Sequence, residues 1–192
     1  MPTTFERNAP NAFDDPRVEL IIADALEVLD TTTETWDVII SDLSDPIESG
    51  PSFTLFTKEY FAKLKRVLNP RGYLMVQAGP ISPPEVQDHA RLVNTLKAVF
   101  SNVTSLSAPT PSYGRAWGFA LCSESAIALQ PEPTKIDRLL AEKTSGGYRF
   151  LDGISLLGIL QPPLYVRQAI ATETMVYTLE QPPRFFGTGV SS

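Results

Sequence analysis

Three short apolar runs, each closed by a polar side chain, constrain the fold of this chain more than any other feature. The runs cover residues 18–23, 36–41 and 72–76. They close on Asp24, Asp42 and Gln77. Runs this short and this rich in Val, Ile and Leu are typical of strands buried on both faces of a parallel sheet. Ligands of open α/β sheets bind at the carboxyl ends of the strands, so these three side chains are the first candidates for a site.

Helical segments separate the later runs. Residues 57–68 place apolar side chains at helical spacing, and the Pro- and Gly-containing string at 69–72 then turns the chain into the third run. Residues 86–100 carry a second apolar stripe of the same kind. The alternation of strands with helices predicts an α/β fold.

Farther along the chain, strand candidates at residues 102–106 and 117–122 flank a Pro-rich loop. A close pair of strands after an alternating pattern predicts an antiparallel edge on a mostly parallel sheet. The pattern then weakens, and short helices are predicted only over 136–142 and 164–172.

Charge and composition narrow the range of functions. The net charge of -6 argues against a nucleic-acid partner, and no apolar run is long enough to span a bilayer. The first residues lack the order of a secretory signal, and the single cysteine, Cys122, fits a reducing compartment, so we expect a cytoplasmic protein. With one histidine, His89, no metal cluster of His and Cys is expected. His89 has polar neighbours, and we expect it to be a solvated helix residue.

Two carboxylates, Asp42 and Asp45, lie three residues apart directly after the second run. Pro46 keeps Asp45 out of the helical region, so a loop is expected to display both acids. Paired acids at the mouth of a sheet attract a cationic amine. Turns also use Asp and Pro for structural reasons alone, and the spacing leaves both interpretations open.

The other candidates each have a structural explanation as well. Asp24, followed by Ala25, is equally expected as the N-terminal cap of a short helix. Gln77 is a polar side chain at the point where a strand ends, which is weak evidence for a site by itself. Tyr113 and Trp117 flank a loop, where an aromatic pair usually packs together.

Taken in order, these strings resemble the polyamine aminopropyltransferases, the family of the spermidine, spermine and thermospermine synthases. The matching strings lie at residues 13–25, 36–46, 55–61, 68–72 and 76–79. Further strings are similar to the thermospermine synthase branch, at residues 42–51, 77–80, 111–113, 117–118 and 184–189.

The resemblance implies transfer of an aminopropyl group from decarboxylated S-adenosylmethionine to putrescine or spermidine, with methylthioadenosine as the other product. The sulfonium already activates the reacting methylene, so no metal and no further cofactor are expected. The amine, with a pKa of about 10.4, arrives protonated, and the resemblance makes Asp42 the acceptor of its proton. It assigns polyamine binding to Asp45, Gln77 and Tyr113, and binding of the donor's adenine to Asp24, Ala25 and Pro46.

Compared with the family, the chain has no glycine-rich loop ahead of Asp24. The resemblance therefore implies that residues 1–130 are the C-terminal part of the nucleotide-binding domain without its first two strands, an incomplete doubly wound Rossmann-like sheet of the class I methyltransferase type. Residues 131–192 would pack on that domain as a helical and irregular extension. The segment at 18–23 would lack a neighbouring strand and expose apolar surface. We expect the isolated chain to be a poor catalyst.

The expected partners are a polyamine and a nucleoside sulfonium, with no nucleic acid and no membrane. A homo-oligomer or a complementing N-terminal chain would supply the missing donor site. Two other functions stay open. A class I S-adenosylmethionine-dependent methyltransferase shares the fold, although methyl transfer to a neutral or anionic acceptor does not need paired acids. A non-catalytic fragment, or half of a split protein, would explain the missing loop.

Overall fold

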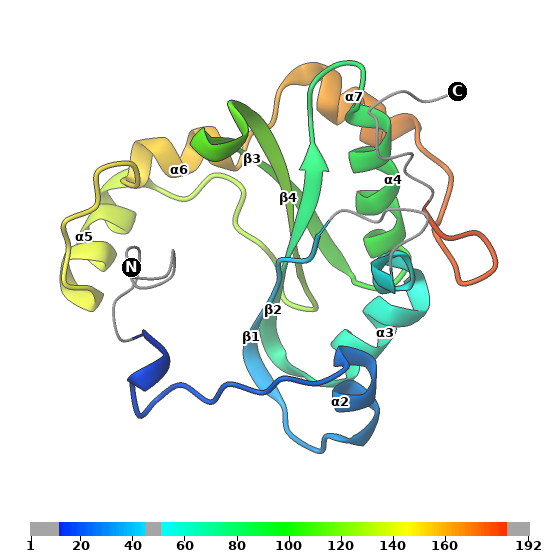
Figure 1. Ribbon diagram of the computed structural model, residues 1–192. Helices are drawn as coiled ribbons and strands as arrows, with labels where there is room; N and C mark the ends of the chain where they lie inside the picture. The colour runs from blue at the N-terminus through cyan, green and yellow to red at the C-terminus, as the bar shows by residue number, and fades with distance from the viewer. Residues whose placement is uncertain (1–11, 45–50, 184–192) are drawn as a thin grey trace. The chain divides into compact units, whose positions relative to one another are not determined.

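The computed structural model describes residues 12–44 and 51–183, and the chain divides into two units, Met1–Thr32 and Thr33–Ser192. Figure 1 shows the elements of both units. Asp45 and Pro46 lie outside the described residues.

In the first unit, a 3-10 turn η1 (Ala12–Asp14) and helix α2 (Ala25–Thr31) flank the first apolar run. The predicted strand at 18–23 is wrong, because these residues form no strand. A strand must pair its backbone groups with a neighbour, and residues 12–32 contain no second strand. The expected exposure of apolar side chains is confirmed, since Leu20 is 61% and Ile22 91% exposed.

The second unit is built on a sheet of four strands in the order β1-β2-β4-β3. The strands are β1 (Trp36–Ser41), β2 (Leu68–Pro80), β3 (Asn102–Thr110) and β4 (Arg115–Ser123). β1 and β2 are parallel, whereas β4 is antiparallel to both β2 and β3. The α/β class and the antiparallel edge are confirmed. The sheet is mixed, with one parallel pair rather than a mostly parallel order, because the first apolar run adds no strand.

Helices α3 (Lys58–Arg66) and α4 (Val86–Lys97) lie on one face of this sheet (Figure 1). Thr57 begins α3, since its side chain accepts a hydrogen bond from the Tyr60 backbone N–H at 3.4 Å. The core beneath the helices is fully buried and includes Phe61, Leu74 and Leu96. Burial of each such side chain contributes about 1.5–3 kcal/mol. Two 3-10 turns, η2 (Pro51–Phe56) and η3 (Pro111–Tyr113), complete the connections.

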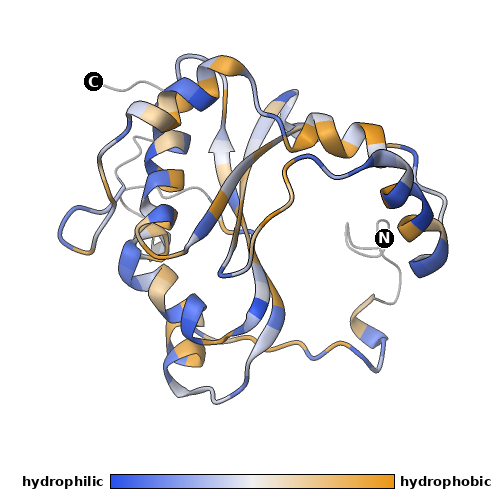
Figure 2. Cartoon of the chain, turned by 180° about the vertical axis from the view of Figure 1, so that it is seen from behind, coloured by the Kyte–Doolittle hydropathy of each residue, from blue (hydrophilic) through white to orange (hydrophobic). Residues whose placement is uncertain are grey.

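Three helices follow the sheet: α5 (Pro133–Lys143), α6 (Gly153–Ile159) and α7 (Leu164–Thr172). The predicted helices over 136–142 and 164–172 correspond to α5 and α7. α6 was not predicted, although Asp152 and Ser155 form a capping box at its start. Figure 2 shows α6 as largely hydrophobic. α7 packs against α4, and the domain boundary expected near residue 130 stays a prediction.

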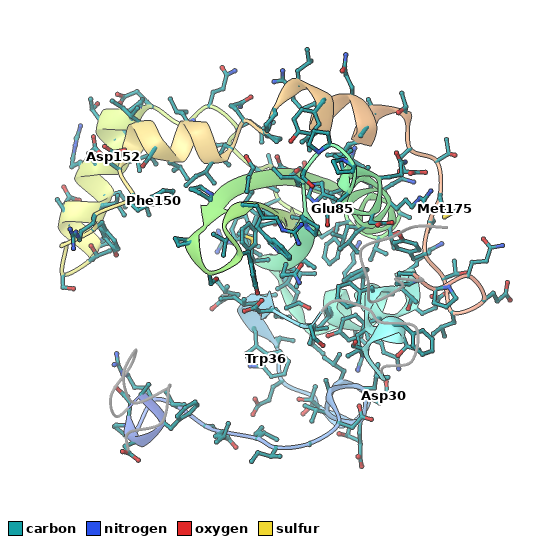
Figure 3. All side chains as sticks on the ribbon, turned by 45° about the horizontal axis from the view of Figure 1, so that its top comes forward. Asp30, Trp36, Glu85, Phe150, Asp152 and Met175 are labelled. Carbon is teal, nitrogen blue, oxygen red and sulfur yellow. The ribbon has the colours of Figure 1, made fainter. Side chains whose placement is uncertain are left out.

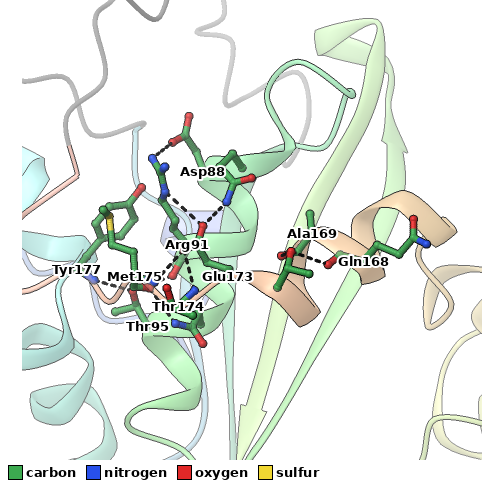
Figure 4. Close-up of polar contacts among 12 residues, drawn as sticks. Asp88, Arg91, Thr95, Gln168, Ala169, Glu173, Thr174, Met175 and Tyr177 are labelled. Atoms are coloured by element: carbon green, nitrogen blue, oxygen red, sulfur yellow. Dashed lines mark hydrogen bonds and ion pairs between the residues drawn. The ribbon is translucent and has the colours of Figure 1, made fainter.

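Beyond α7, polar contacts join the chain to α4 (Figure 4) and to the start of α3. The Tyr177 backbone N–H donates to the Thr95 hydroxyl at 2.9 Å, and the Tyr177 carbonyl accepts from the Lys58 N–H at 2.9 Å. Arg91 Nε lies 3.3 Å from a carboxylate oxygen of Glu173, whose side chain is only 7% exposed. The segment therefore ties the start of α3 to the middle of α4.

Candidate active site

β1 and β2 run parallel, so their carboxyl ends meet at one end of the sheet. Their register pairs Ser41 with Val76, and the next residues along the two strands are Asp42 and Gln77. The Gln77 Nε2 group donates to the Leu43 carbonyl at 3.1 Å. A buried carboxamide on β2 thus holds the turn that carries the exposed carboxylate of Asp42. The predicted placement of these two residues at one sheet end is confirmed, while their roles stay predictions.

The other end of the Gln77 carboxamide binds its own strand. Its Oε1 accepts from the Gly79 N–H at 2.6 Å. The pairing of β2 with β4 is irregular between Gln77 and Pro80, and Gly79 has a φ of 77°. Glycine favours this left-handed region because it has no Cβ to clash with the backbone. Because strand pairing is irregular here, the Gln77 side chain can accept a hydrogen bond from the backbone N–H two residues farther along the chain.

Ser41, directly before Asp42, is anchored from α3. Its side chain forms a hydrogen bond with Tyr60. Burial raises the pKa of Tyr60, and this hydrogen bond lowers it by less. The backbone around Asp42 is therefore fixed on one side by α3 and on the other by β2.

Tyr113 lies at the same end of the sheet. β4 runs antiparallel to β2, and Trp117 near its start pairs with Pro80 at the end of β2. The rings of Tyr113 and Trp117 lie 4.3 Å apart at 34°. Packing is therefore confirmed for the pair, but the two differ in exposure, with Tyr113 at 56% and Trp117 at 4%. The outer ring leaves one face open to a ligand.

A charged pair lies beside the ring of Trp117. The Arg115 guanidinium lies 5.4 Å from the centre of the Trp117 ring and 2.7 Å from a carboxylate oxygen of Glu85. Figure 3 labels Glu85, which precedes α4. Within the part of the chain that the structure describes, Trp117 Nε1 is buried and has no hydrogen-bond partner.

Two of the predicted adenine-binding residues, Asp24 and Ala25, belong to the first unit. Asp24, in the first unit, is the N-terminal cap of α2, because its Oδ1 accepts from the Leu26 N–H at 2.8 Å. Ala25 is the first residue of that helix. The capping explanation is confirmed, and the donor-binding role of both residues stays a prediction. The roles of Asp45 and Pro46 also stay predictions, since both lie outside the described residues.

His89 was expected to be solvated, and that expectation is wrong. It is 1% exposed, with Nδ1 2.9 Å from the Ala78 carbonyl and Nε2 2.8 Å from the Ser105 hydroxyl. Burial lowers the pKa of His89 to about 4. Its place in a helix was predicted, but its polar neighbours in sequence suggested an exposed face. Residues 89, 93 and 96 share one face of α4, and Val93 and Leu96 are core residues.

No group of three or more His, Cys, Asp or Glu side chains in residues 12–44 and 51–183 is arranged to hold a metal ion. No helix within those ranges is both long and apolar enough to cross a membrane. A hollow of about 190 Å³ between α4, β3 and residues 160–170 contains none of the predicted site residues. No carboxylate is among the residues that line this hollow.

Comparison with known proteins points to one family. The Spermine/spermidine synthase domain matches residues 2–131. A polyamine aminopropyltransferase of Synechococcus sp. (strain JA-2-3B'a(2-13)) is 50% identical over 176 residues, which cover 90% of this chain and 56% of that protein. Thermospermine synthase ACAULIS5 of Arabidopsis thaliana is 32% identical over 185 residues, 94% of this chain and 53% of that protein.

The solved structure of spermidine synthase from Thermotoga maritima has the same fold, with a TM-score of 0.72 at 19% identity over 88% of this chain and 55% of that one. This agreement confirms the Rossmann-like fold of the class I methyltransferase type. The chain spans about half the length of the curated relatives it matches. By its domain match and its identity to curated relatives, the chain belongs to the spermine/spermidine synthase family.

Proposed function

We propose that this chain carries the amine-activating side of an aminopropyltransferase site. The reaction moves an aminopropyl group from decarboxylated S-adenosylmethionine to putrescine or spermidine, giving spermidine or a longer polyamine and methylthioadenosine. The observation that carries the proposal is the Gln77–Leu43 hydrogen bond, which fixes the turn at Asp42 where β1 and β2 end. Family membership supports the type of reaction.

The chemistry requires a proton acceptor. With a pKa of about 10.4, roughly one amine in 2,500 is neutral at pH 7. In the proposed step Asp42 takes one proton from the substrate ammonium, and the freed lone pair attacks the methylene carbon beside the sulfonium. The carbon–sulfur bond breaks, its electron pair stays on sulfur, and neutral methylthioadenosine leaves. Asp42 then returns the proton to solvent.

The other predicted residues position the two substrates. Asp45 would hold the distal ammonium of the polyamine, and Gln77 and Tyr113 would line its channel. An exposed tyrosine ring suits this role, because an ammonium over an aromatic face gains about 0.5–2 kcal/mol. Asp24 would accept a hydrogen bond from the adenine amino group, beside Ala25 and Pro46. No metal takes part in this reaction.

A partner-dependent form of the same function is supported by the edge of the sheet. β1 is an edge strand, and its side chains Val38 and Ile40 are 60% and 72% exposed. Edge strands with apolar side chains tend to pair with another chain. We propose that a complementing N-terminal chain, or a second copy, covers β1 and supplies the rest of the donor site.

The test measures methylthioadenosine release from decarboxylated S-adenosylmethionine with putrescine or spermidine as acceptor. Asp42→Asn should slow release by about 10²- to 10⁴-fold, the usual contribution of a general base. Glu142→Gln, which removes a carboxylate from an exposed position on α5, should leave the rate unchanged. Equal rates for Asp42→Asn and wild type would refute the assignment of Asp42.

Two further outcomes separate the alternatives. Transfer of a methyl group from S-adenosylmethionine to an acceptor would favour the methyltransferase. Calorimetry with methylthioadenosine distinguishes binding from catalysis: binding without turnover supports a half that needs a partner, whereas no heat of binding argues against an intact donor pocket in this chain.

A further inference from the structure

We propose that His89 is a positioning residue for the acceptor site: from α4 it fixes the peptide group between Ala78 and Gly79, and through that group it orients the Gln77 carboxamide that holds the Asp42 turn. The positioning itself rests on geometry. Its consequence for aminopropyl transfer rests on the proposed function.

His89 reaches three strands from one helix. It contacts the Ala78 carbonyl on β2 and the Ser105 hydroxyl on β3. On β4 it lies over Gly118, where a Cβ would stand 2.4 Å from the histidine Nδ1. Since real Cβ contacts do not come that close, the ring occupies space that only a glycine leaves.

The two hydrogen bonds define one state of the ring. A carbonyl oxygen only accepts, so Nδ1 carries the proton and donates to Ala78. In the neutral ring Nε2 then accepts, and the Ser105 hydroxyl donates to it. The low pKa of His89, about 4, keeps the ring neutral at pH 7. Both ring nitrogens are thereby satisfied in a single orientation.

The peptide group held by His89 is the one that Gln77 binds from the other side. The carbonyl of Ala78 and the N–H of Gly79 belong to one planar unit and point in opposite directions. His89 donates to the first, and the Gln77 Oε1 accepts from the second at 2.6 Å. Regular pairing of β2 with β4 is interrupted between Gln77 and Pro80. The hydrogen bonds between these strands therefore do not hold this peptide group as they hold the rest of β2.

Loss of the His89 donor would therefore free this peptide group to turn. Its N–H would leave the Gln77 Oε1, and the carboxamide would lose one of the contacts that orient its Nε2 toward the Leu43 carbonyl. The turn at Asp42 would then lose one of its supports. A displacement of about 1 Å at a reacting group costs on the order of 10²-fold in rate.

The experiment compares His89→Leu, which keeps much of the volume without a donor, with His89→Asn, whose amide nitrogen can take the place of Nδ1. The first readout is NMR of the Gly79 amide and the Gln77 side-chain amide in the full chain. We expect His89→Leu to lose hydrogen-exchange protection at both groups and His89→Asn to restore it. Unchanged protection in His89→Leu overturns the proposal.

The second readout is kinetic. We expect His89→Leu to lower kcat for methylthioadenosine release on the order of 10- to 100-fold with the KM of the donor unchanged, and His89→Asn to recover most of the loss. Loss of protection with full kcat overturns the link to Asp42. If His89→Leu fails to fold, Ser105→Ala keeps the ring, removes its second partner, and is expected to cause a smaller loss of the same protection.

The two proposals fail separately. If wild-type chain releases no methylthioadenosine under any condition, the proposed function fails. The protection of the Gly79 and Gln77 amides still decides whether His89 positions this segment.

Discussion

Gln77 and His89 hold opposite sides of the same peptide group. The N–H of Gly79 donates to the Gln77 Oε1, and the carbonyl of Ala78 accepts from His89 Nδ1 at 2.9 Å. One side chain belongs to β2 and the other to α4, so a strand end and a helix are connected through backbone at the place where strand pairing becomes irregular. Because the Gln77 Nε2 also donates to the Leu43 carbonyl, this connection extends to the turn at Asp42.

The first prediction concerns the Gln77 side chain. Gln77→Glu replaces the N–H donor with a carboxylate oxygen facing the Leu43 carbonyl, and both atoms are acceptors. We expect kcat/KM for aminopropyl transfer to fall roughly 10- to 100-fold, because the turn at Asp42 loses its support. Steady-state assays of methylthioadenosine release measure this fall.

A matched control exists in the chain. Gln161 also donates from Nε2 to a backbone carbonyl, that of Leu129, at the same 3.1 Å. Gln161→Glu should leave kcat/KM unchanged. Similar losses of activity in both variants would mean that the effect is on the fold in general and not on the site.

The second prediction concerns the space under His89. In Gly118→Ala the new Cβ would lie 2.4 Å from His89 Nδ1 and 2.6 Å from Ile81 Cγ2. Overpacking of this kind costs about 1–3 kcal/mol of unfolding free energy. Gly158→Ala in α6 meets nothing within 4 Å and should be neutral or stabilising by about 0.5–1 kcal/mol. Urea denaturation measures the unfolding free energy of both variants. Equal denaturation midpoints for the two would contradict the prediction.

The third prediction is a pH dependence of stability. The pKa of His89 is about 4 in the folded protein and about 6.5 in the unfolded chain. Between these values the unfolded chain binds more protons, so stability is present above pH 6.5 and is lost as the pH falls toward 4. The loss from His89 is roughly 3 kcal/mol.

Other groups also contribute to the pH dependence of stability, including Asp88, whose pKa is raised by burial. The measurement is therefore the difference in unfolding free energy between wild type and His89→Asn at several pH values. The carboxylates cancel in this difference, and only His89 remains. A difference that stays constant from pH 7 to pH 4.5 would show that His89 is not the buried neutral group described above.

The spacing of apolar residues predicted the helices and strands whose formation depends mainly on their own residues. The strands at 36–41 and 72–76 and the helix over 57–68 were recognised from spacing, and the rule that ligands bind at strand ends brought Asp42 and Gln77 together. β2 begins earlier than predicted, at Leu68, because pairing with β1 extends the strand through the expected turn.

What the sequence did not predict depends on contacts between distant residues. The run at 18–23 has the composition of a strand but no neighbour to pair with in its unit. The burial of His89 follows from the carbonyl of Ala78 and the hydroxyl of Ser105, 11 and 16 residues away. Pattern indicates which face of a helix is buried, but not that a polar side chain there will find both partners.

The fourth prediction concerns the segment after α7. Arg91 Nε and the Glu173 carboxylate form an ion pair at 3.3 Å, although Nε lacks the geometry of a hydrogen bond. The side chain of Glu173 is 7% exposed, so Arg91→Leu leaves a poorly solvated charge and should cost about 1–3 kcal/mol of stability. Thermal unfolding measures the cost.

An exposed ion pair provides the contrast. Arg17 lies closer to its partner, at 2.7 Å from Asp15, but its side chain is 88% exposed. Arg17→Leu should change stability by less than about 1 kcal/mol. If Arg17→Leu proved the more damaging variant, distance rather than burial would govern these pairs, and the reasoning for Glu173 would be wrong.

The fifth prediction concerns the open face of Tyr113. If an ammonium of the polyamine lies over this ring, Tyr113→Ala removes about 0.5–2 kcal/mol of binding, which corresponds to a rise in the polyamine KM of about 2- to 30-fold. Tyr113→Phe keeps the ring and should keep the KM. The KM of decarboxylated S-adenosylmethionine and kcat should change little in either variant, because the proposal assigns this ring to the polyamine and not to the donor.

Tyr148 is the control for Tyr113, since it is 51% exposed, lies in the loop between α5 and α6 and is not among the predicted site residues. Tyr148→Ala should leave every kinetic constant unchanged. Because Tyr113 also packs on Trp117, thermal unfolding of Tyr113→Ala is measured alongside the kinetics. A lower melting temperature with an unchanged polyamine KM would assign Tyr113 to packing alone and remove it from the proposed acceptor site.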